Sequence, residues 1–155
     1  MKLYDIVVAD AIIPELTAKT RNEAITEIIE ALVSAGAIAR RNATEATKAV
    51  LAREAQATTG IGKGVALPDA KLKGIKKPIA AIGRSSKGID FSSLDSKPVH
   101  SVILLLSDPS SPDEHLRAME TIFKHVQRDI FRKLLHQSRT RQAIIDLIKE
   151  ADELE

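Results

Sequence analysis

The residues with the most chemical potential lie in one glycine-rich stretch, Thr58–Asp69, which ends in a carboxylate. Three of the chain's seven glycines, Gly60, Gly62 and Gly64, fall close together there, so the backbone can turn sharply and approach another group closely. The spacing is not that of a dinucleotide fingerprint, and no Gly-Lys-Ser/Thr ending marks a P-loop. The glycines alone are therefore consistent both with a functional loop and with a plain turn.

The other candidate groups are weaker when each is judged by itself. His100 falls on a predicted strand, whereas His125 and His136 fall on predicted helices, and no pair has the spacing of metal ligands. We expect these three histidines to be structural or surface residues, and the pattern implies no metal and no organic cofactor. Ser107 and Ser110 would need a base to act as nucleophiles, and no triad pattern accompanies them.

Capping signals and apolar periodicity predict four helices. The motifs T-R-N-E from Thr20 and N-A-T-E from Asn42 are typical capping boxes, and S-P-D-E from Ser111 combines a serine cap with proline and acids in the first turn. A last helix is expected over Arg141–Ala151. The predicted inward residues are Ala24, Ile25, Ile28, Ile29, Leu32 and Val33, then Ala46, Ala49 and Val50, then Leu116, Met119, Ile122, Phe123 and Val126, and finally Ile144, Ile145, Leu147 and Ile148.

Apolar runs between these helices predict the strands. Gly64–Pro68, Pro78–Ile82 and Val99–Leu106 are the main candidates, Ile12–Leu16 is a fourth, and Arg84–Ser96 is expected to be a long loop. Helices before and after a cluster of strands predict an α/β fold. We expect a single layered domain over residues 1–155, with a mixed β-sheet flanked by helices on both faces.

Composition narrows the classes of function. The chain has 155 residues, the size of one domain, and only 3% aromatic residues, which argues against a base-stacking platform for nucleic acid. Its net charge of +2 does not require a polyanionic partner. With no cysteine there is no disulfide framework, and no apolar run is long enough to cross a bilayer. We expect a cytoplasmic protein with no nucleic-acid partner and no membrane insertion.

A family resemblance becomes specific between Arg53 and Pro68. The run R-E-A-Q-A-T-T-G-I-G-K-G-V-A-L-P is similar to the active-site signature of the fructose/mannitol/nitrogen-regulatory type of enzyme IIA, from the bacterial phosphotransferase system. The resemblance covers nearly the whole chain, because further segments fall in the family's order: Ile6–Leu16, the Thr20 helix, Lys77-Pro78, Ile89-Asp90-Phe91 and Pro112–Leu116. It implies an enzyme IIA mannitol/fructose-like fold. Because the domain stands alone without a fused transporter, we expect the nitrogen-regulatory or fructose-like branch.

The resemblance also assigns roles to site residues. In that family the residue after the proline is a histidine, which takes a phosphoryl group from a histidine-containing phosphocarrier protein and passes it to a sugar-transporter domain or keeps it as a regulatory mark. This chain carries Asp69 at that position. His115 matches the second histidine, which contacts the phosphorylated ring, and Arg53 matches the arginine that holds phosphate charge. The active-site loop would comprise Thr59, Gly60, Gly62, Gly64 and Pro68.

Either Asp69 was introduced by mutagenesis into a histidine-bearing parent, or it is native, and in the second case two functional hypotheses follow. A carboxylate, with a pKa near ~4, is ionised at neutral pH and repels a phosphoryl group, whereas a neutral imidazole does not. The first hypothesis is a regulatory protein-binding module that is impaired in phosphorylation, in which Asp69 imitates part of the phosphorylated state beside His115 and Arg53. The second is an active relay to a sugar transporter with Asp69 or His115 as the acceptor, since acyl phosphates do form on aspartate.

Overall fold

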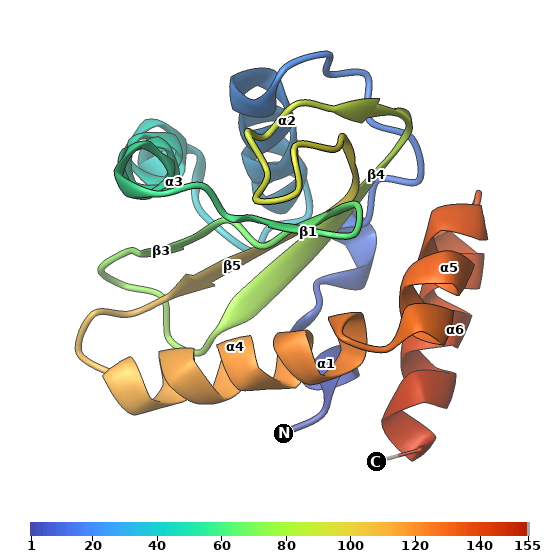
Figure 1. The fold of residues 1–155 in the computed structure, drawn as a ribbon. Coiled ribbons are helices and arrows are strands. Elements are labelled where there is room, and N and C mark those ends of the chain that lie inside the picture. The colour runs from blue at the N-terminus through green and yellow to red at the C-terminus, as the bar shows by residue number, and fades with distance from the viewer. Residues whose placement is uncertain (155) are drawn as a thin grey trace.

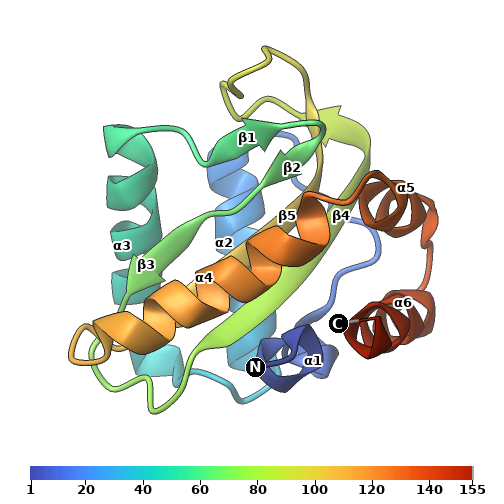
Figure 2. The same cartoon turned by 60° about the horizontal axis from the view of Figure 1, so that its bottom comes forward.

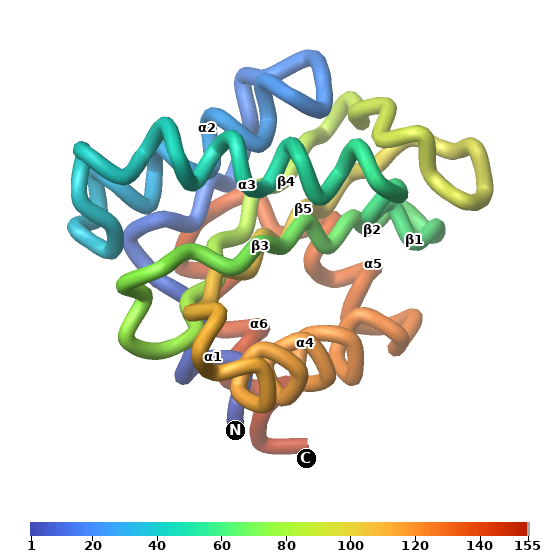
Figure 3. Tube along the Cα trace, turned by 90° about the vertical axis from the view of Figure 1, so that its left-hand side faces the viewer, coloured from blue at the N-terminus to red at the C-terminus, as the bar shows by residue number. Residues whose placement is uncertain are grey.

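A five-stranded sheet forms the middle layer of the computed structural model, which describes residues 1–154 (Figures 1 and 3). The strands are β1 (Gly60–Gly62), β2 (Val65–Ala66), β3 (Asp69–Lys71), β4 (Ile79–Ile89) and β5 (Val99–Ser107). β5 is central, because β4 pairs with it antiparallel on one side while β2 and β3 pair with it parallel on the other. The mixed sheet predicted from the sequence is confirmed.

β2 and β3 are two halves of one strand line. Val65 pairs with Ser101 and Asp69 pairs with Leu105, so the register along β5 is the same before and after the break. The break falls at Pro68, which has no N–H to donate to a ladder. Its carbonyl still accepts from the Leu105 N–H at 2.9 Å, so the line continues to Asp69.

Two helices cover one face of the sheet. These are α2 (Arg21–Ser34) and α3 (Ala43–Gln56), which is preceded by the 3₁₀ turn η2 (Arg40–Asn42). Because alternate residues of a strand point to opposite faces, Leu104 and Leu106 of β5 join the core beneath α2 and α3.

The opposite face is covered by the remaining helices, as Figure 2 shows with α4 crossing in front of the sheet. They are α1 (Leu3–Ile6), α4 (Pro112–Val126), α5 (Asp129–Gln137) and α6 (Arg141–Glu153), and the short 3₁₀ turn η1 (Ala9–Ala11) follows α1. Ile103 and Leu105 belong to this second core. Helices therefore flank both faces, as expected.

The predicted helix starts are correct in position but only partly in mechanism. At Thr20 the capping box is confirmed, since its Oγ1 accepts from the Glu23 N–H at 3.2 Å and Glu23 Oε1 accepts from the Thr20 N–H at 3.1 Å. The box predicted at Asn42 is wrong, because η2 runs straight into α3 and leaves Asn42 with a helical backbone and no side-chain cap. Ser111 also makes no side-chain cap, although Pro112 does occupy the first turn.

The predicted inward faces of α2, α3 and α6 are largely correct. Only Val33, Ala49 and Ile145 among the residues named for those helices are half-buried instead of buried.

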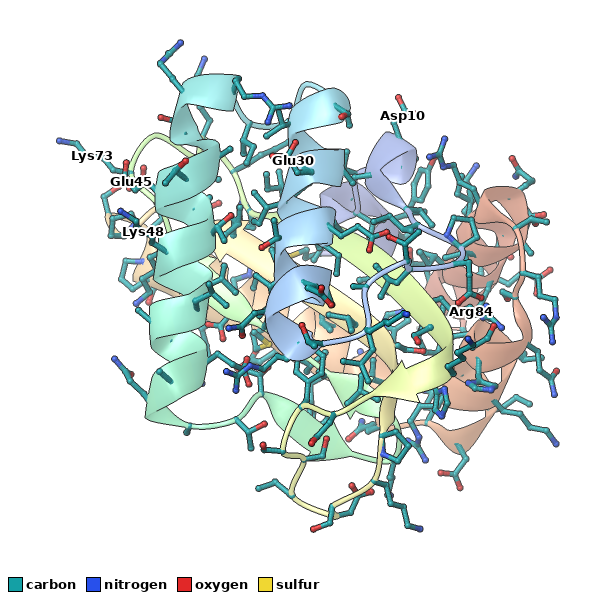
Figure 4. The ribbon with its side chains drawn as sticks, turned by 90° about the horizontal axis from the view of Figure 1, so that it is seen from above. Asp10, Glu30, Glu45, Lys48, Lys73 and Arg84 are labelled. Atoms are coloured by element: carbon teal, nitrogen blue, oxygen red, sulfur yellow. The ribbon has the colours of Figure 1, made fainter. Side chains whose placement is uncertain are left out.

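The expected loop over Arg84–Ser96 is wrong at its start, because β4 continues to Ile89. Arg84 is only 2% exposed and lies between β4 and the α5/α6 pair (Figure 4). Its guanidinium donates to the His136 carbonyl at 2.7 Å and to the Pro14 carbonyl at 3.0 Å. Ile12–Leu16 is not a regular strand, but Ile13 makes an isolated parallel bridge to Gly83 on the outer edge of β4.

Within residues 1–154, no helix has both the length and the apolar character needed to cross a membrane.

A buried carboxylate fastens the beginning of the described chain to its last helix. Asp152 of α6 accepts the N–H groups of Leu3 and Tyr4, each at 2.9 Å, and Oδ1 lies 3.1 Å from His125 Nε2 of α4. The first N–H groups of a helix have no partner inside the helix, so this carboxylate satisfies two donors of α1. The contact confirms His125 as a structural residue.

The Asp152→Ala variant should lose about 3 kcal/mol of unfolding free energy, because two amide donors lose their acceptor and His125 loses its neighbouring carboxylate in a buried place. Urea denaturation followed by circular dichroism measures the loss. Glu150→Ala, an exposed acid on the same helix, is the matched control and should change stability by less than about 0.5 kcal/mol. Equal stability of the two variants would contradict this role.

Candidate functional site

A cleft of about 480 Å³ lies between the first half of α4 and the edge formed by β1, β3 and the end of α3. Asp69, His115 and Arg53, the three residues singled out from the sequence, all line it. Thr59 also lines it, whereas Gly62 and Gly64 do not.

The sheet places Asp69 in the cleft. Val65 and Leu67 belong to the core beneath α4. Asp69 is two residues further along the same strand line, so its side chain points to the same face of the sheet. The chain leaves β5 at Ser107, turns through Asp108–Ser111 and begins α4, whose first turn carries His115. Residues far apart in the sequence therefore meet because β3 and the end of β5 are neighbours in the sheet.

The Asp69 carboxylate is held from two sides. Oδ2 lies 2.9 Å from His115 Nε2, and Oδ1 lies 3.6 Å from Arg53 Nε. The Asp69 and His115 side chains are only 15% and 13% exposed, whereas that of Arg53 is 40% exposed. Arg53 is itself positioned by donating to the Ala57 carbonyl at 3.1 Å. The site is thus one negative charge between an imidazole and a guanidinium.

Asp69 and Ser107 each contact one ring nitrogen of His115. An ionised carboxylate only accepts hydrogen bonds, so Nε2 must carry the proton that it donates to Asp69. Nδ1 of the neutral ring is then an acceptor, and it contacts the Ser107 hydroxyl, which donates to it. This contact could not be predicted from the sequence, because it depends on how β5 and α4 are joined.

The chain Asp69–His115–Ser107 contains the residue types of a hydrolase triad in the wrong arrangement. In such a triad the serine faces the substrate and the carboxylate lies behind the histidine. Here Asp69 lines the cleft, while Ser107 is 1% exposed and lies behind His115. The arrangement presents a carboxylate to a partner and does not support serine nucleophilic catalysis.

A buried acid supports the loop beside Asp69. Glu54, at the end of α3, is 2% exposed and accepts the Thr59 N–H at 2.8 Å and the Thr59 hydroxyl at 2.6 Å. The adjacent Arg53 points instead to Asp69. The Arg-Glu pair of the signature therefore performs two separate tasks, and the task of Glu54 was not foreseen from the sequence.

The glycine motif forms the β1–β2 hairpin. Gly62, Lys63 and Gly64 have φ values of 97°, 58° and 79°, a run in the left-handed region that favours glycine. Asp95 accepts the Lys63 N–H at 2.9 Å across the turn. Hydrogen bonds from the N–H groups of Lys63 and then Lys97 lower the pKa of Asp95 from its ordinary value. Gly60 approaches Ser93 so closely that a Cβ there would lie 2.3 Å from the Ser93 hydroxyl.

Exposed apolar side chains form a rim around the cleft. Some of them come from the face of α4 that was predicted to be buried, so that prediction is wrong in part. Leu116 and Phe123 were expected to be buried, but they are 57% and 48% exposed, and Ile61 of β1 is 36% exposed. The buried face of α4 is instead formed by Ala118, Ile122, His125 and Val126. A second apolar stripe on α4 is therefore free to meet another molecule beside Asp69.

Among the residues that the structure describes, no three His, Cys, Asp or Glu side chains cluster in a way that could hold a metal ion.

Comparison with known sequences identifies one family. The family model described as "Phosphoenolpyruvate-dependent sugar phosphotransferase system, EIIA 2" matches residues 5–151. The chain is 32% identical to the PTS system fructose-specific EIIA component of Haloferax volcanii, covering 86% of each chain. It is also 32% identical to a nitrogen regulatory protein of Bradyrhizobium diazoefficiens, covering 96% of this chain and 95% of that one.

Another relative is much longer. The chain is 34% identical to the PTS system fructose-specific EIIABC component of Bacillus subtilis over 98% of its own length, and it spans only 24% of that protein.

Solved structures show the same fold. Nitrogen regulatory protein IIA-Ntr from Neisseria meningitidis superimposes with a TM-score of 0.81 at 21% identity, covering 93% of this chain and 97% of that one. IIA mannitol from Escherichia coli gives a TM-score of 0.75 at 20% identity, covering 90% and 96%. These likenesses confirm the predicted α/β fold class.

Replacing Glu54 with Gln should loosen the loop that borders Asp69. In the variant, one carboxylate oxygen is replaced by an NH₂ group, which cannot accept a hydrogen bond from the Thr59 N–H or hydroxyl. The buried donor left without an acceptor costs about 2 kcal/mol of unfolding free energy. Hydrogen exchange of the Thr59 and Gly60 amides should accelerate in parallel. Glu45→Gln, on the exposed side of the same helix (Figure 4), is the control and should leave both measurements nearly unchanged. Unchanged exchange in Glu54→Gln would show that the carboxylate does not hold the loop.

Proposed function

The chain belongs to the EIIA type 2 family of the phosphoenolpyruvate-dependent sugar phosphotransferase system, and on that premise we propose that it acts in the cytoplasm as a regulatory protein-binding module, impaired in phosphorylation. Asp69 stands where the family resemblance places a phosphorylated histidine. In this proposal its permanent charge replaces part of the phosphoryl charge. The output of the module is contact with a partner protein.

The observation that carries the proposal is the contact of Asp69 with a hydrogen-bond donor and a cation of the protein itself. His115 Nε2 at 2.9 Å and Arg53 Nε at 3.6 Å both face the carboxylate. These are the groups that would balance the charge of a phosphoryl group in a family site. Since Asp69 already engages them, the site has the electrostatic pattern of an occupied acceptor with about one negative charge instead of nearly two.

The hydrogen bonds also leave little nucleophilic capacity. His115 Nε2 carries the proton donated to Asp69, and Nδ1 accepts from Ser107, so neither nitrogen offers a lone pair to the cleft. The carboxylate itself would have to give up its contact with His115 and approach a phosphoryl group of like charge. Both requirements slow transfer and support impairment.

The partner surface in this proposal is the apolar rim, formed by Ile61, Leu116, Met119 and Phe123 around the carboxylate. Exposed apolar side chains around one charged group are typical of an interaction site with a specific centre. The solved complex of Escherichia coli enzyme IIAMtl with phosphorylated enzyme IIBMtl shows that a protein of this fold binds a protein partner. We propose that this rim binds a histidine-containing phosphocarrier protein, a sugar-transporter domain or a regulatory target.

The alternative function is an active phosphoryl relay to a sugar transporter. It is favoured by the position of Asp69, whose oxygens lie in the cleft and are within reach of a docked donor. In that case the phosphorus–nitrogen bond of the carrier's phosphohistidine breaks and a phosphorus–oxygen bond forms on Asp69, or a new phosphorus–nitrogen bond forms on His115.

A phosphotransfer assay separates the two functions. The chain is incubated with a phosphorylated phosphocarrier protein, and its intact mass is measured beside that of Asp69→His. We expect no uptake by the natural chain, and uptake of one phosphoryl group by Asp69→His, because that variant restores a nucleophilic nitrogen in a site that keeps Arg53 and His115.

The controls make each outcome informative. Asp69→Asn should stay unlabelled, and a known enzyme IIA should accept the label from the same carrier. Uptake by the chain with Asp69 would contradict impairment. Its disappearance in Asp69→Asn would assign the phosphoryl group to Asp69, and its persistence there would point to His115. A base-labile adduct would mark aspartate, and an acid-labile adduct would mark His115.

The rim can be tested independently of phosphorylation. Leu116→Asp should weaken binding of the phosphocarrier protein by about 2 kcal/mol, roughly 30-fold in Kd, because it puts a charge into the apolar contact beside Asp69. Isothermal titration calorimetry measures the change. The matched control is Ile130→Asp on α5, an equally exposed residue (59%) outside the cleft, which should bind as the natural chain does. Equal affinities of all three proteins would exclude this rim as the docking site.

A further inference from the structure

A second cleft of about 370 Å³ opens between α5 and the start of β5. Helix α5 packs on the same side of the sheet as α4 (Figure 2). Its walls come from the β1–β2 hairpin at Lys63–Val65, from His100 and Ser101 of β5, and from α5. It shares no lining residue with the Asp69 cleft. Neither the resemblance nor the relatives assign a role to it.

The charges of this second cleft are strongly unequal. Lys63, Arg132 and Lys133 line it together with a single carboxylate, that of Asp129. Asp129 forms an ion pair with Arg132, so these two charges offset each other. The ammonium groups of Lys63 and Lys133 then make the electrostatic potential of the cleft positive. Within residues 1–154 neither ammonium forms an ion pair. Two cationic side chains from different elements thus converge on one concave space in a chain whose net charge is only +2.

Two imidazoles occupy the floor of the cleft. The rings of His100 and His136 meet edge to face, with centroids 4.5 Å apart. His100 Nδ1 lies 2.9 Å from the Ser85 carbonyl, so it carries a proton and donates to that oxygen. From the sequence, both histidines were expected to be structural or surface residues, because they do not have the spacing of metal ligands.

The surroundings of His136 also indicate a positive field. Burial lowers the pKa of His136 from its ordinary value, and the neighbouring His100, Arg84 and Arg139 lower it further. Arg84 approaches from β4 and donates to the His136 carbonyl, whereas Arg132 and Lys133 come from α5 and Lys63 from the hairpin. A negative ligand in the cleft would offset this repulsion and favour protonation of the ring.

We propose that this second cleft, which we call the basic cleft, binds a small phosphorylated metabolite, with its phosphoryl group between Lys63 and Lys133 and beside His136. A volume of about 370 Å³ suits a small ligand and not a polymer. Ammonium groups and imidazolium donors form charge-assisted hydrogen bonds to phosphoryl oxygens. Ser101 and Gln137, which also line the cleft, supply neutral polar groups for the rest of the molecule.

A ligand in the basic cleft would contact the β1–β2 hairpin, which also lines the Asp69 cleft. Ile61 on β1 lines the Asp69 cleft, and Lys63 and Gly64 line the basic cleft. The hairpin is therefore a common wall of both.

The test is an NMR titration of the whole chain, in which the ring signals of its four histidines are followed separately. The probes are a hexose phosphate, inorganic phosphate, and the unphosphorylated hexose as the neutral counterpart. We expect saturable shifts of His100 and His136 with the hexose phosphate, weaker binding of inorganic phosphate, and no shift with the neutral hexose. Binding of the hexose phosphate should strengthen as pH falls through the titration of His136, since a protonated ring attracts the ligand and the bound ligand raises the pKa of that ring.

Charge variants locate the ligand. Lys133→Ala and Lys63→Asn should each weaken binding of the hexose phosphate about tenfold, the value of one charge-assisted contact. Asparagine is chosen at position 63 because it tolerates the positive φ of that residue. Lys48→Ala, an exposed lysine on α3 on the far face of the sheet (Figure 4), removes the same charge and should leave the affinity unchanged.

Three results would overturn the proposal. One is the absence of saturable shifts at His100 and His136, and another is a shift confined to His115, which would place the anion in the Asp69 cleft. The third is equal weakening by Lys48→Ala, which would mean that only the overall charge of the chain matters. None of these results bears on whether Asp69 is phosphorylated.

Discussion

The pairing of β5 on both of its edges is the constraint on which the remaining structure depends. β4 lies against one edge and the β2/β3 line against the other, and eight of the nine residues of β5 are buried. A strand that is apolar on both faces requires a layer of helices on each side. The position of the site follows from it, because Asp69 pairs beside Leu105, and β5 then ends at Ser107, where the chain turns into α4 and carries His115 back over the sheet.

The electrostatics of the Asp69 cleft follow from a balance of burial and pairing. A carboxylate that is largely withdrawn from water is costly unless it is paired. His115 and Arg53 provide that pairing, and Ser107 provides the hydrogen bond that holds His115 in the required tautomer. Phosphate chemistry and a fixed negative charge make similar demands on the surrounding groups. The same scaffold can therefore hold either one, which is why the identity of the residue at position 69 matters more than the shape of the cleft.

Features with local signals could be predicted from the sequence. The α2 helix was predicted closely, because its capping box and its apolar stripe lie within consecutive turns. The far half of β4 was missed, since Arg84 is buried only because Pro14 and His136, both remote in the sequence, supply carbonyl partners. The apolar residues of α4 fall on two faces of the helix, and their spacing alone does not show which face packs against the sheet. Leu116 and Phe123 were assigned to the wrong one.

The site itself was reached by resemblance and not by spacing. Arg53, Asp69 and His115 come from three elements, and only the family resemblance placed them together in advance. Ser107 and Glu54 carry no such label, because their roles depend on a turn and on burial that the sequence does not display. The contact between His100 and His136 was missed for the same reason, because only the packing of α5 on β5 brings the two rings together.

The attachment of α1 to Asp152 has a consequence for the order in which the chain folds. The hydrogen bond between the Leu3 amide and Asp152 spans 149 positions, so it closes almost the largest loop that this chain can form. Contacts of such long sequence separation form late, because the entropy of closing the loop is lost before the contact contributes. During synthesis, α1 emerges from the ribosome before α6 and must wait for that helix before it can settle. Until then, Leu3 and Ile6 and the surface that they cover stay exposed to chaperones, and the packing of α6 removes that exposure.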